Sequence, residues 1–563
     1  MYFSIQQPTK SERREMLLDL LKEENRVDDY PFLVESLSPP EEITNIASPG
    51  SGKNMTIGII GGGMAGLAAA FELRKLGFHI TIFDAQKHRI GGRVYTHYFD
   101  ANGQYYGELG AMRIPISHES VWHYIDLFGL KVRPFIQTTP ADTFYIRHHY
   151  ACNDVSGQSV MRNIYPSFDL TPQERRTPWR ELLNNPIKSL LESMPPKVRQ
   201  EIIRIKKEYH PKIVEIDNLK IRDVFKLAGL SQGAIHMLGN LSPPIDDFSY
   251  RSAIELLSDA YSLDSVTLYR IHGGTAKLPL AFYHSFYHPN TKKYYPKLYG
   301  EHLGVVSYKG GHRVEKVQQV YPRGPVVIHY RNGRGSYLQT QTFDYVICAI
   351  PFSTLRHVDL CPLFSSKKMQ AIQEFTYENA FKTVQFFSKR FWEEPNIICG
   401  IKLGGSSVTD RPVTSIWYPS DHSEYLNLPF PPPDEPGVLL STYNFALDAV
   451  RLGNLPSRRK YHEITSQIEE IHRLPKGYLD PILLDQRSVN WNDEEWSLGA
   501  FGYYSPSQKS VFSWIMAQPE YDNRIFFSGE HVSGKHGWIQ GALKTGMEAA
   551  NSIARVIRES DVR

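Results

Sequence analysis

Residues 56–70 read Thr-Ile-Gly-Ile-Ile-Gly-Gly-Gly-Met-Ala-Gly-Leu-Ala-Ala-Ala, and this stretch decides the fold. A short β-branched run leads into the spacing Gly61-x-Gly63-x-x-Gly66, and Ala- and Leu-rich sequence follows. That order predicts a strand, a tight turn and a helix that together bind a dinucleotide. Gly61 permits the turn, Gly63 lets the backbone approach a pyrophosphate, and Gly66 lets the helix pack closely on the strand.

The sequence after this stretch supports the same interpretation. A second apolar run at 78–83 ends in Asp84, which lies 84 − 66 = 18 residues beyond the last glycine. An acid at this place can accept hydrogen bonds from a ribose hydroxyl. Closely spaced glycines can also form a simple turn, but strand, helix, strand and acid together favour a nucleotide site. These residues alone leave FAD and NAD as alternatives.

Length and charge limit the class of protein. The chain of 563 residues is long enough for roughly three or four domain-sized units. Its 63 basic and 60 acidic side chains nearly balance, so no bulk charge favours nucleic acid or an anionic membrane. We therefore expect small-molecule partners, with no nucleic acid and no membrane.

The cysteines and the N-terminus indicate a compartment. Cys152, Cys348, Cys361 and Cys399 show no paired spacing, which predicts neither a disulfide framework nor a CxxC metal site. Residues 1–26 are polar and lack the apolar run of a signal peptide. No window supplies the roughly 18 apolar residues that a membrane-spanning helix needs. These features favour a soluble protein in the reducing cytoplasm.

Periodicity indicates further elements along the chain. From residue 155 to 270 the sequence has a helical period and no glycine-rich motif, which predicts a helical insertion. A nearly continuous apolar run at 343–350 is typical of a buried parallel strand, and residues 380–500 suggest a mixed sheet with loops. Residues 524–530 predict a last strand, and the apolar spacing from Ile539 predicts a final helix.

Six short motifs are spread over most of the chain. They are Gly61-x-Gly63-x-x-Gly66, Gly91-Gly92-Arg93, Glu108-Leu109-Gly110-Ala111-Met112-Arg113, Gly273-Gly274 with Leu278-Pro279, Ala380-Phe381-Lys382, and Gly529-Glu530 with His536-Gly537-Trp538-Ile539. Together they resemble the flavin-dependent L-amino acid oxidases of the monoamine-oxidase-type flavoprotein superfamily. The glycine fingerprint is widely shared, whereas Met112-Arg113 and Gly537-Trp538 are similar to the amino acid oxidases in particular. The resemblance implies FAD rather than NAD.

The resemblance also implies the fold class and its division into domains. We expect an α/β protein with a Rossmann-type FAD-binding domain of the glutathione-reductase-like kind, a mixed-sheet substrate domain and a helical insertion. The expected units are an N-terminal helical arm and linker at 1–50, a discontinuous FAD-binding domain at 51–95, 273–372 and 520–563, a substrate-binding domain at 96–154 and 373–519, and a helical domain at 155–272.

Three residues match the family's substrate and oxygen chemistry. Moving a hydride from Cα to flavin N5 requires a fixed carboxylate, and Arg113 resembles the family's bidentate carboxylate clamp. Pairing of Arg113 with a structural acid such as Glu108 is the alternative. Tyr443 matches the tyrosine that donates to the same carboxylate, or is a plain core aromatic. Lys382 corresponds to the lysine that holds a water at flavin N5 and helps dioxygen react, or is a solvated surface lysine.

The C-terminal motif implies further contacts with substrate and flavin. Trp538 matches one aromatic wall of the substrate cage, and Gly537 offers a carbonyl to the amine. Ile539 opens the final helix, so its N–H can stabilise negative charge at the flavin N1–C2=O edge. The resemblance places Val314 at the adenine and Glu530 at the ribityl and pyrophosphate region. The full expected cofactor-binding set is Gly61, Gly63, Met64, Ala65, Gly66, Asp84, Ala85, Gly92, Arg93, Gly110, Ala111, Met112, Arg113, Val314, Gly529, Glu530, Trp538 and Ile539.

Neither a metal ion nor a covalent flavin is expected. His531 and His536 are five residues apart, a spacing that does not give the i, i+4 pair of a helical zinc site. No cysteine lies between Asp485 and Arg563, where related monoamine oxidases attach their flavin. The FAD should therefore be non-covalent.

Acidic residues distinguish this chain from its apparent relatives. The family's Trp-x-x-Asp-Pro-Tyr stretch appears here as Trp491-Asn-Asp-Glu-Glu-Trp496, and Glu378 stands where venom-type relatives have arginine. Asp259 follows the helix that lines their side-chain pocket. Acids on loops are usually solvated, but together these favour a cationic substrate, L-arginine or L-lysine. The expected side-chain residues are Glu494, Asp493, Trp491, Glu378 and Asp259.

The leading hypothesis is oxidative deamination of an L-amino acid by FAD and O2, giving the 2-oxo acid, ammonia and hydrogen peroxide. We also expect a homo-oligomer, a dimer or larger. The alternatives are an oxidase of broad or apolar specificity, an amine or polyamine oxidase, a decarboxylating flavin monooxygenase, and a flavin-holding interaction protein without turnover. An amine oxidase has no need for Arg113, and Arg113, Tyr443 and Lys382 together argue against the last alternative.

Overall fold

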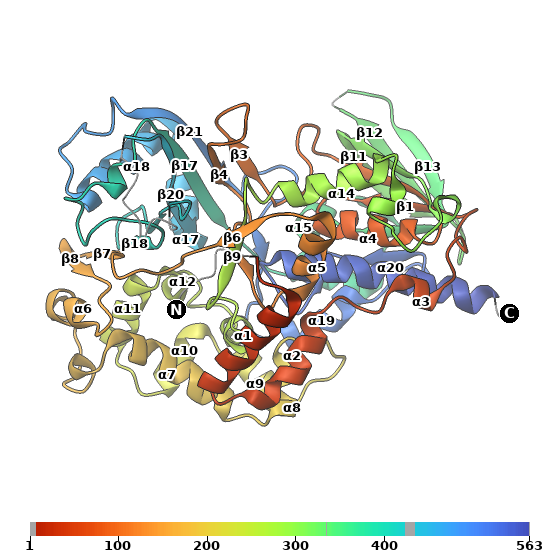
Figure 1. The fold of residues 1–563 in the computed structure, drawn as a ribbon. Coiled ribbons are helices and arrows are strands. Elements are labelled where there is room, and N and C mark those ends of the chain that lie inside the picture. Colours follow the sequence, from red (N-terminus) through yellow and green to blue (C-terminus); the bar gives the residue numbers. More distant parts are fainter. Residues whose placement is uncertain (1–6, 334, 423–433, 562–563) are drawn as a thin grey trace.

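The computed structural model describes residues 7–333, 335–422 and 434–561, and it has the expected α/β fold (Figure 1). The proline run at 429–433, which the sequence predicts to be a turn, lies outside the described residues. The parallel sheet, a mixed sheet and a helical region occupy separate parts of the molecule (Figure 1).

A five-stranded parallel sheet carries the glycine motif. Strand β1 (Thr56–Ile60) lies at its centre, between β2 (His79–Asp84) and β14 (Tyr345–Cys348). The edges are β10 (Val306–Gly310) and β23 (Ile525–Phe527). Its inner strands are almost entirely buried, as expected for a parallel sheet covered on both faces. The predicted strands at the glycine motif, before Asp84 and at the two later positions are confirmed.

Two helices pack together beside this sheet. They are α4 (Met64–Arg74), which follows the glycine turn, and α20 (Ile539–Asp561), which confirms the predicted final helix. A Cβ on Gly66 would lie 2.1 Å from the carbonyl oxygen of Gly61, so only glycine permits this approach of helix and strand. The role predicted for the third glycine in helix–strand packing is therefore confirmed.

A second, four-stranded sheet packs on the parallel sheet. Its strand order is β13 (Gln339–Phe343), β12 (Val326–Asn332), β11 (His312–Gln319) and β15 (Asp359–Cys361). Side chains of β12 and β13 reach Gly58 in β1, where a Cβ would meet Ile328 at 2.7 Å and Phe343 at 2.8 Å. This contact buries one face of the central strand.

A seven-stranded mixed sheet forms the other large layer. Its order is β21 (Leu483–Asn490), β17 (Ala380–Phe387), β20 (Gly437–Phe445), β19 (Ser415–Trp417), β18 (Ser406–Thr409), β7 (Thr143–Ile146) and β8 (His149–Cys152). Only the β7–β18 pairing within it is parallel. Strands far apart in sequence thus share one sheet, and β17 and β20 are neighbours next to its edge strand β21.

The region between β8 and β9 (Leu268–Ile271) is helical, as predicted. Its helices include α6 (Gln158–Asn163), α7 (Trp179–Glu192), α8 (Pro196–Arg199), α9 (Pro211–Asn218), α10 (Ile221–Leu227), α11 (Gln232–Leu241), α12 (Pro243–Asp247) and α13 (Ala253–Tyr261). Ahead of the glycine motif, the N-terminal helices are α1 (Lys10–Glu23), α2 (Tyr30–Leu37) and α3 (Ile43–Ile46). The buried ion pair of Arg13 with Glu119 at 2.9 Å fastens α1 to the core.

The cysteines differ from the prediction. Cys152, the last residue of β8, forms a disulfide with Cys399, 247 residues further along the chain. The expectation that no cysteine pairs is therefore wrong, and a pairing over so long a separation leaves no local spacing to detect. Cys348 is a buried thiol and Cys361 an exposed one. Within the described ranges, no helix is both long enough and apolar enough to cross a membrane.

Candidate functional site

A cavity lies where the carboxyl ends of the parallel strands face the mixed sheet. Its walls come from the turns after β1, β2, β14 and β23 and from side chains of β17 and β20. It brings together most residues that the sequence singled out. These are Gly61, Gly63, Met64, Ala65, Asp84, Gly92, Arg93, Gly110, Ala111, Lys382, Tyr443, Trp491, Gly529, Glu530, Gly537, Trp538 and Ile539.

Several expected residues do not line this cavity. They are Gly66, Ala85, Met112, Arg113, Asp259, Val314, Glu378, Asp493 and Glu494. Gly66 acts in packing α4, and Val314 is a buried residue of β11 opposite Tyr330. The sulfur of Met112 lies 3.6 Å from Lys382 Nζ, directly behind the cavity wall.

The turn into α4 has the form of an anion site. The first helical hydrogen bond runs from Leu67 N to Gly63 O, at 3.0 Å, so the N–H groups of the preceding turn have no intrahelical acceptor. A Cβ on Gly63 would have only Gly92 Cα near it, at 4.0 Å, so this glycine faces open space. Free N–H groups, the positive helix end and an open approach together fit a pyrophosphate.

Asp84 lies next to this turn and is almost fully buried. Gln86 N donates to its Oδ1 at 2.9 Å, and Tyr308 Oη donates to its Oδ2 at 2.7 Å. Burial raises the pKa of this carboxyl, while these hydrogen bonds oppose the rise. A Cβ on Gly62 would come within 2.4 Å of Asp84 Oδ2, so the middle glycine of the motif leaves room for the acid.

Glu530 holds the opposite wall. Its carboxylate accepts from Arg93 Nη1 at 2.6 Å and from the backbone N–H groups of Gly502 and Gly537, each at 3.0 Å. Burial opposes ionisation, but Arg93 and nearby His536 lower the pKa of Glu530 to about 2. Buried Glu530 and partly buried Arg93 therefore form an ion pair.

Lys382 is a buried lysine, not a solvated one. It is 2% exposed, and its Nζ donates to Gly110 O at 2.7 Å. Burial, with Arg113 nearby, lowers the pKa of this amine to about 7. Lys382 is paired across the sheet with Tyr443, and its Nζ lies 4.1 Å from the centre of that ring.

Arg113 lies beside these two residues without an acidic partner. Its Nη1 donates to Gln137 Oε1 at 2.8 Å, and its guanidinium lies 5.3 Å from the ring centre of Trp417. In residues 7–333, 335–422 and 434–561, no carboxylate lies within ion-pair distance of it. The alternative partner Glu108 instead accepts from Thr96 and Thr275. Burial lowers the pKa of Arg113, and Tyr443 and Asp259 are the charges that oppose this.

Tyr443 presents a protonated hydroxyl at the same place. Burial raises the pKa of its phenol to about 12, while Arg113 lowers it. A tyrosine with this pKa is a hydrogen-bond donor at neutral pH. Lys382 and Tyr443 therefore give one end of the cavity a cation and a hydroxyl, and Arg113, outside the lining, is a second cation that interacts electrostatically with both.

Asp259 approaches this end from the helical region. Its Oδ1 accepts from Trp538 Nε1 at 3.0 Å and from Lys535 Nζ at 3.3 Å. Burial raises the pKa of Asp259 to about 6, and Lys535 opposes this shift. The side chain is 44% accessible to solvent.

The other predicted acids lie elsewhere. Glu378 is buried against Arg251, and Glu494 lies 3.8 Å from Arg89 Nη2. Asp493 is exposed and accepts from Asn490 Nδ2 at 2.6 Å. The structure thus does not bring these three acids together with Arg113 and Tyr443.

Sequence reasoning missed some residues of the cavity. Arg89 lines it, and its guanidinium lies over the rings of Tyr95 at 4.6 Å and Trp491 at 5.8 Å. Its position just before Gly91-Gly92 was the available signal. Gln137 and Tyr308, which hold Arg113 and Asp84, stand in stretches without a motif, so nothing in the sequence marked them.

Comparisons with known proteins agree with this geometry. The chain is 26% identical over 537 residues to an L-amino-acid oxidase of Notechis scutatus scutatus, covering 93% of this chain and 92% of the relative. It is 28% identical over 545 residues to an L-amino-acid oxidase of Daboia russelii, covering 95% and 94%.

Solved structures share the fold. A putrescine oxidase bound to putrescine superposes with a TM-score of 0.65 at 16% identity, over 89% of this chain and 98% of that one. Cyclohexylamine oxidase from Brevibacterium oxydans gives a TM-score of 0.63 at 16% identity, over 90% and 100%. The model of the flavin-containing amine oxidoreductases matches residues 64–554, most of the chain. The chain therefore belongs to the flavin-containing amine oxidoreductase family.

Proposed function

We propose that this chain is an FAD-dependent L-amino acid oxidase. The observation that carries the proposal is the Arg113 guanidinium, which lies beside the Tyr443 hydroxyl and has no carboxylate at ion-pair distance in the described parts of the chain. A fork of N–H donors without an acid is suited to a ligand carboxylate. FAD, when bound, would supply the hydride acceptor and pass the electrons to O2 as hydrogen peroxide, and water would hydrolyse the resulting imino acid to a 2-oxo acid and ammonia.

The residues of the cavity fit a non-covalent FAD. The first turn of α4 would bind the pyrophosphate, and Asp84 would accept from the adenosine ribose. Glu530 and the N-terminus of α20 at Ile539 would border the remainder of the cofactor. No cysteine follows Cys399 in the given sequence, which supports non-covalent binding.

The substrate end would bind and orient the amino acid. Arg113 and Tyr443 would hold the α-carboxylate through a charge-assisted fork and one hydroxyl donor. The Gly537 carbonyl would accept from the amine, and Trp538 would form one wall. Lys382, with a pKa of about 7, can hold or release a proton at neutral pH and can hold a water by its Nζ.

We further propose a preference for L-arginine or L-lysine, resting on Asp259. This carboxylate is accessible and interacts electrostatically with Arg113 at the substrate end. Asp259 already pairs with Lys535 at 3.3 Å, and its accessible carboxylate leaves room for a second cation, whereas an apolar side chain would make no charged contact there. Glu494 and Glu378 carry no part of this proposal, since they lie apart from Arg113 and Tyr443.

An amine oxidase is the second candidate, because the solved structures that share this fold include a putrescine oxidase. Matched substrate pairs separate the two functions. L-Arginine with its decarboxylated form agmatine, and L-lysine with cadaverine, should be mixed anaerobically with the flavin-loaded protein. We expect the amino acids to bleach the flavin and the amines to leave it oxidised, with peroxide and ammonia released in air. Equal bleaching by agmatine would contradict a carboxylate clamp at Arg113.

A further inference from the structure

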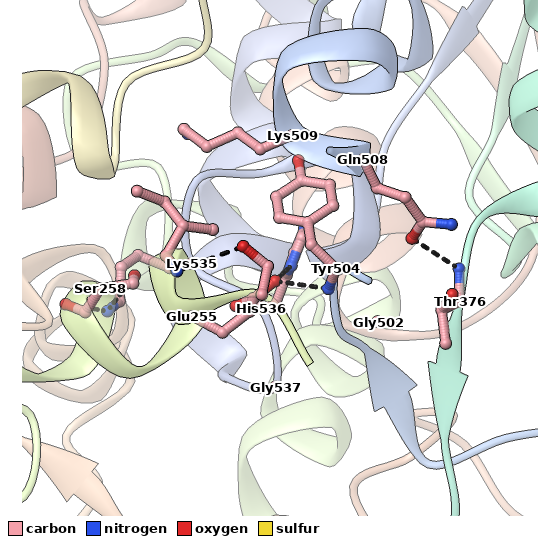
Figure 2. Close-up of polar contacts among 12 residues, drawn as sticks. Glu255, Ser258, Thr376, Gly502, Tyr504, Gln508, Lys509, Lys535, His536 and Gly537 are labelled. Atoms are coloured by element: carbon pink, nitrogen blue, oxygen red, sulfur yellow. Dashed lines mark hydrogen bonds and ion pairs between the residues drawn. The ribbon is translucent and has the colours of Figure 1, made fainter. Parts of the chain in front are cut away.

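The turn Lys535–Trp538 is held by a helix that lies far away in sequence. The turn leads into α20, and its Gly537 and Trp538 line the cofactor cavity. Helix α13, 276 or more residues earlier, contacts it through Glu255, Ser258 and Asp259. Figure 2 shows Glu255 and Ser258 of α13 beside Lys535 and His536 of the turn.

Glu255 makes the first attachment. Its Oε1 lies 2.7 Å from Nδ1 of His536 and also accepts from Tyr504 N at 2.7 Å. Both side chains of the pair are buried. The His536 ring is further enclosed by Tyr504, with ring centres 4.5 Å apart. The position of His536 is therefore fixed by one ionisable partner and by aromatic packing.

Asp259 makes the second attachment, one helical turn further along the same face of α13. It accepts from Trp538 Nε1 at 3.0 Å. Between these two points, Lys535 Nζ donates to Ser258 O at 3.1 Å and forms an ion pair with buried Asp264. The three side chains of the turn, those of Lys535, His536 and Trp538, thus all bind α13 or the loop directly after it.

The cavity side holds the same turn from the opposite direction. Gly537 N donates to Glu530 Oε2 at 3.0 Å, and Glu530 is fixed by Arg93. Gly537 has a φ of +72°, a conformation that favours glycine. The short segment between the two attachments therefore has little freedom.

The contact with Glu255 also favours the protonated form of His536. Burial lowers its pKa, but Glu255 and then Glu530 raise it, with a net rise, while Lys509 opposes them. A group whose pKa is higher in the folded than in the unfolded protein stabilises the fold fully at pH values below its unfolded-state pKa. This stabilisation is lost as pH rises through the folded-state pKa. His536 is thus favoured as a cation beside the cavity. Its Nε2 is buried and has no hydrogen-bond partner in the part of the chain that the structure describes.

We propose that Glu255 and Asp259 are positioning residues. They fix the turn Lys535–Trp538 against the cofactor cavity through two contacts from α13, which we call the two-point clamp. As far as it concerns turnover, this inference rests on the proposed oxidase function. The clamp links the helical region to the wall of the cavity, so the placement of Trp538 depends on Glu255, which does not line the cavity, as well as on Asp259.

The test uses the flavin-loaded full chain with Glu255→Gln, His536→Gln and the double variant. Glu174→Gln is the matched control, because Glu174 is a buried acid of the same helical region whose partners are Thr171 and Ser231. We expect the Glu255 and His536 variants to shift the visible flavin spectrum and lower the flavin midpoint potential, because His536→Gln removes a cation beside the cavity and Glu255→Gln removes the carboxylate that favours the cationic form of His536. Flavin reduction should slow about tenfold, with under about a twofold change in substrate Kd.

The double variant gives the sharpest result. Since Glu255 and His536 act as one unit, flavin reduction should be no slower, and the midpoint potential no lower, in the double variant than in either single variant. The clamp would be overturned if the changes in flavin spectrum, midpoint potential and reduction rate of the two single variants added up in the double variant. An equal spectral shift in Glu174→Gln would overturn it as well. If Glu255→Gln loses its flavin, the second attachment decides in the same way through Asp259→Ala, Trp538→Phe and their double variant. If no amino acid reduces the parent flavin, the oxidase proposal fails, while spectrum and potential still decide the clamp.

Discussion

The two ends of the cofactor cavity treat charge differently. At the nucleotide end, Asp84 is bonded to Tyr308 and Glu530 is paired with Arg93, so each acid has its partner within the protein. At the substrate end, buried Lys382 and partly buried Arg113 are cations that have only neutral hydrogen-bond acceptors in the described parts of the chain. Buried charges are costly without a counter-charge, so the second arrangement is suited to an anionic ligand. The two ends therefore differ in whether their charged side chains already have a charged or hydrogen-bonded partner in the protein or are suited to one from a ligand.

The strongest way to break this contrast is Arg113→Ala. We expect kcat/KM for the best L-amino acid to fall by about 2–5 kcal/mol in transition-state stabilisation, as for a charge pair shielded from water. Flavin content should barely change, because Arg113 is not in the cavity wall. Arg113→Lys keeps the charge but loses the fork, and should recover only part of the activity. Near-normal turnover in Arg113→Ala would return this arginine to a structural role.

The nucleotide end is tested by Glu530→Gln. The pKa of Glu530 is about 2 against an ordinary 4.5, so its stabilisation is present above pH 4.5 and is lost as pH falls towards 2. Removing the charge should destabilise the flavin-loaded protein by about 2–3 kcal/mol at pH 7 and flatten its acid unfolding curve. Thermal midpoints over a pH series would measure both effects. Glu315 pairs with Arg331 at the surface, so Glu315→Gln should change neither the stability at pH 7 nor the acid unfolding curve. An equal loss of stability in Glu315→Gln would show that the Glu530 pair is no more stabilising than a surface pair.

Lys382→Met tests the other buried cation. Reoxidation of the reduced flavin by O2 should slow about tenfold or more, while reduction by substrate changes less. Because the amine is charged below a pKa of about 7, the oxidative rate of the parent should fall as pH rises through 7, and this step should vanish in the variant. Stopped-flow measurement of both half-reactions provides the comparison.

Lys368→Met is the matched control for this prediction. Lys368 is also fully buried with a pKa lowered to about 7, but it donates to Met516 O and Gln518 O, and it is not in the cavity wall. Its removal should not alter the oxidative rate. An unchanged oxidative rate in Lys382→Met would remove Lys382 from the oxygen reaction.

The smallest expected effect concerns the choice of substrate. Asp259→Asn should lower the kcat/KM ratio of L-arginine to L-leucine by about five- to tenfold, since one accessible carboxylate loses its charge. Glu494→Gln should leave the ratio unchanged, because Glu494 faces Arg89. A parent enzyme that prefers leucine would show that Asp259 only holds Trp538 and Lys535.

The nucleotide end was readable from sequence because its information is local. Backbone geometry and glycine spacing define the turn after β1, and Asp84 follows at the end of the next strand. The residues of the substrate end come from separate elements, and only resemblance to a family placed Lys382 and Tyr443 together. Long-range partners were not readable at all.

The acids show this limit most clearly. Glu378 and Glu494 stand in stretches that suggested a substrate pocket, but Glu378 forms an ion pair with Arg251 and Glu494 with Arg89. Charge composition says that an acid is present but not which arginine, 127 or 405 residues away, will reach it. The disulfide of Cys152 with Cys399 was missed for the same reason.

The order of strands in the parallel sheet has a consequence for how the protein is made. The central strand β1 ends at Ile60, and β23 begins at Ile525, so 525 − 60 = 465 residues separate them. At a synthesis rate of roughly 5–20 residues per second, the last strand leaves the ribosome roughly 20–90 s after the first. Until then the glycine turn has no Glu530 or Trp538 opposite it. Flavin loading is therefore expected to follow translation, so flavin supply at chain release governs how much enzyme becomes active.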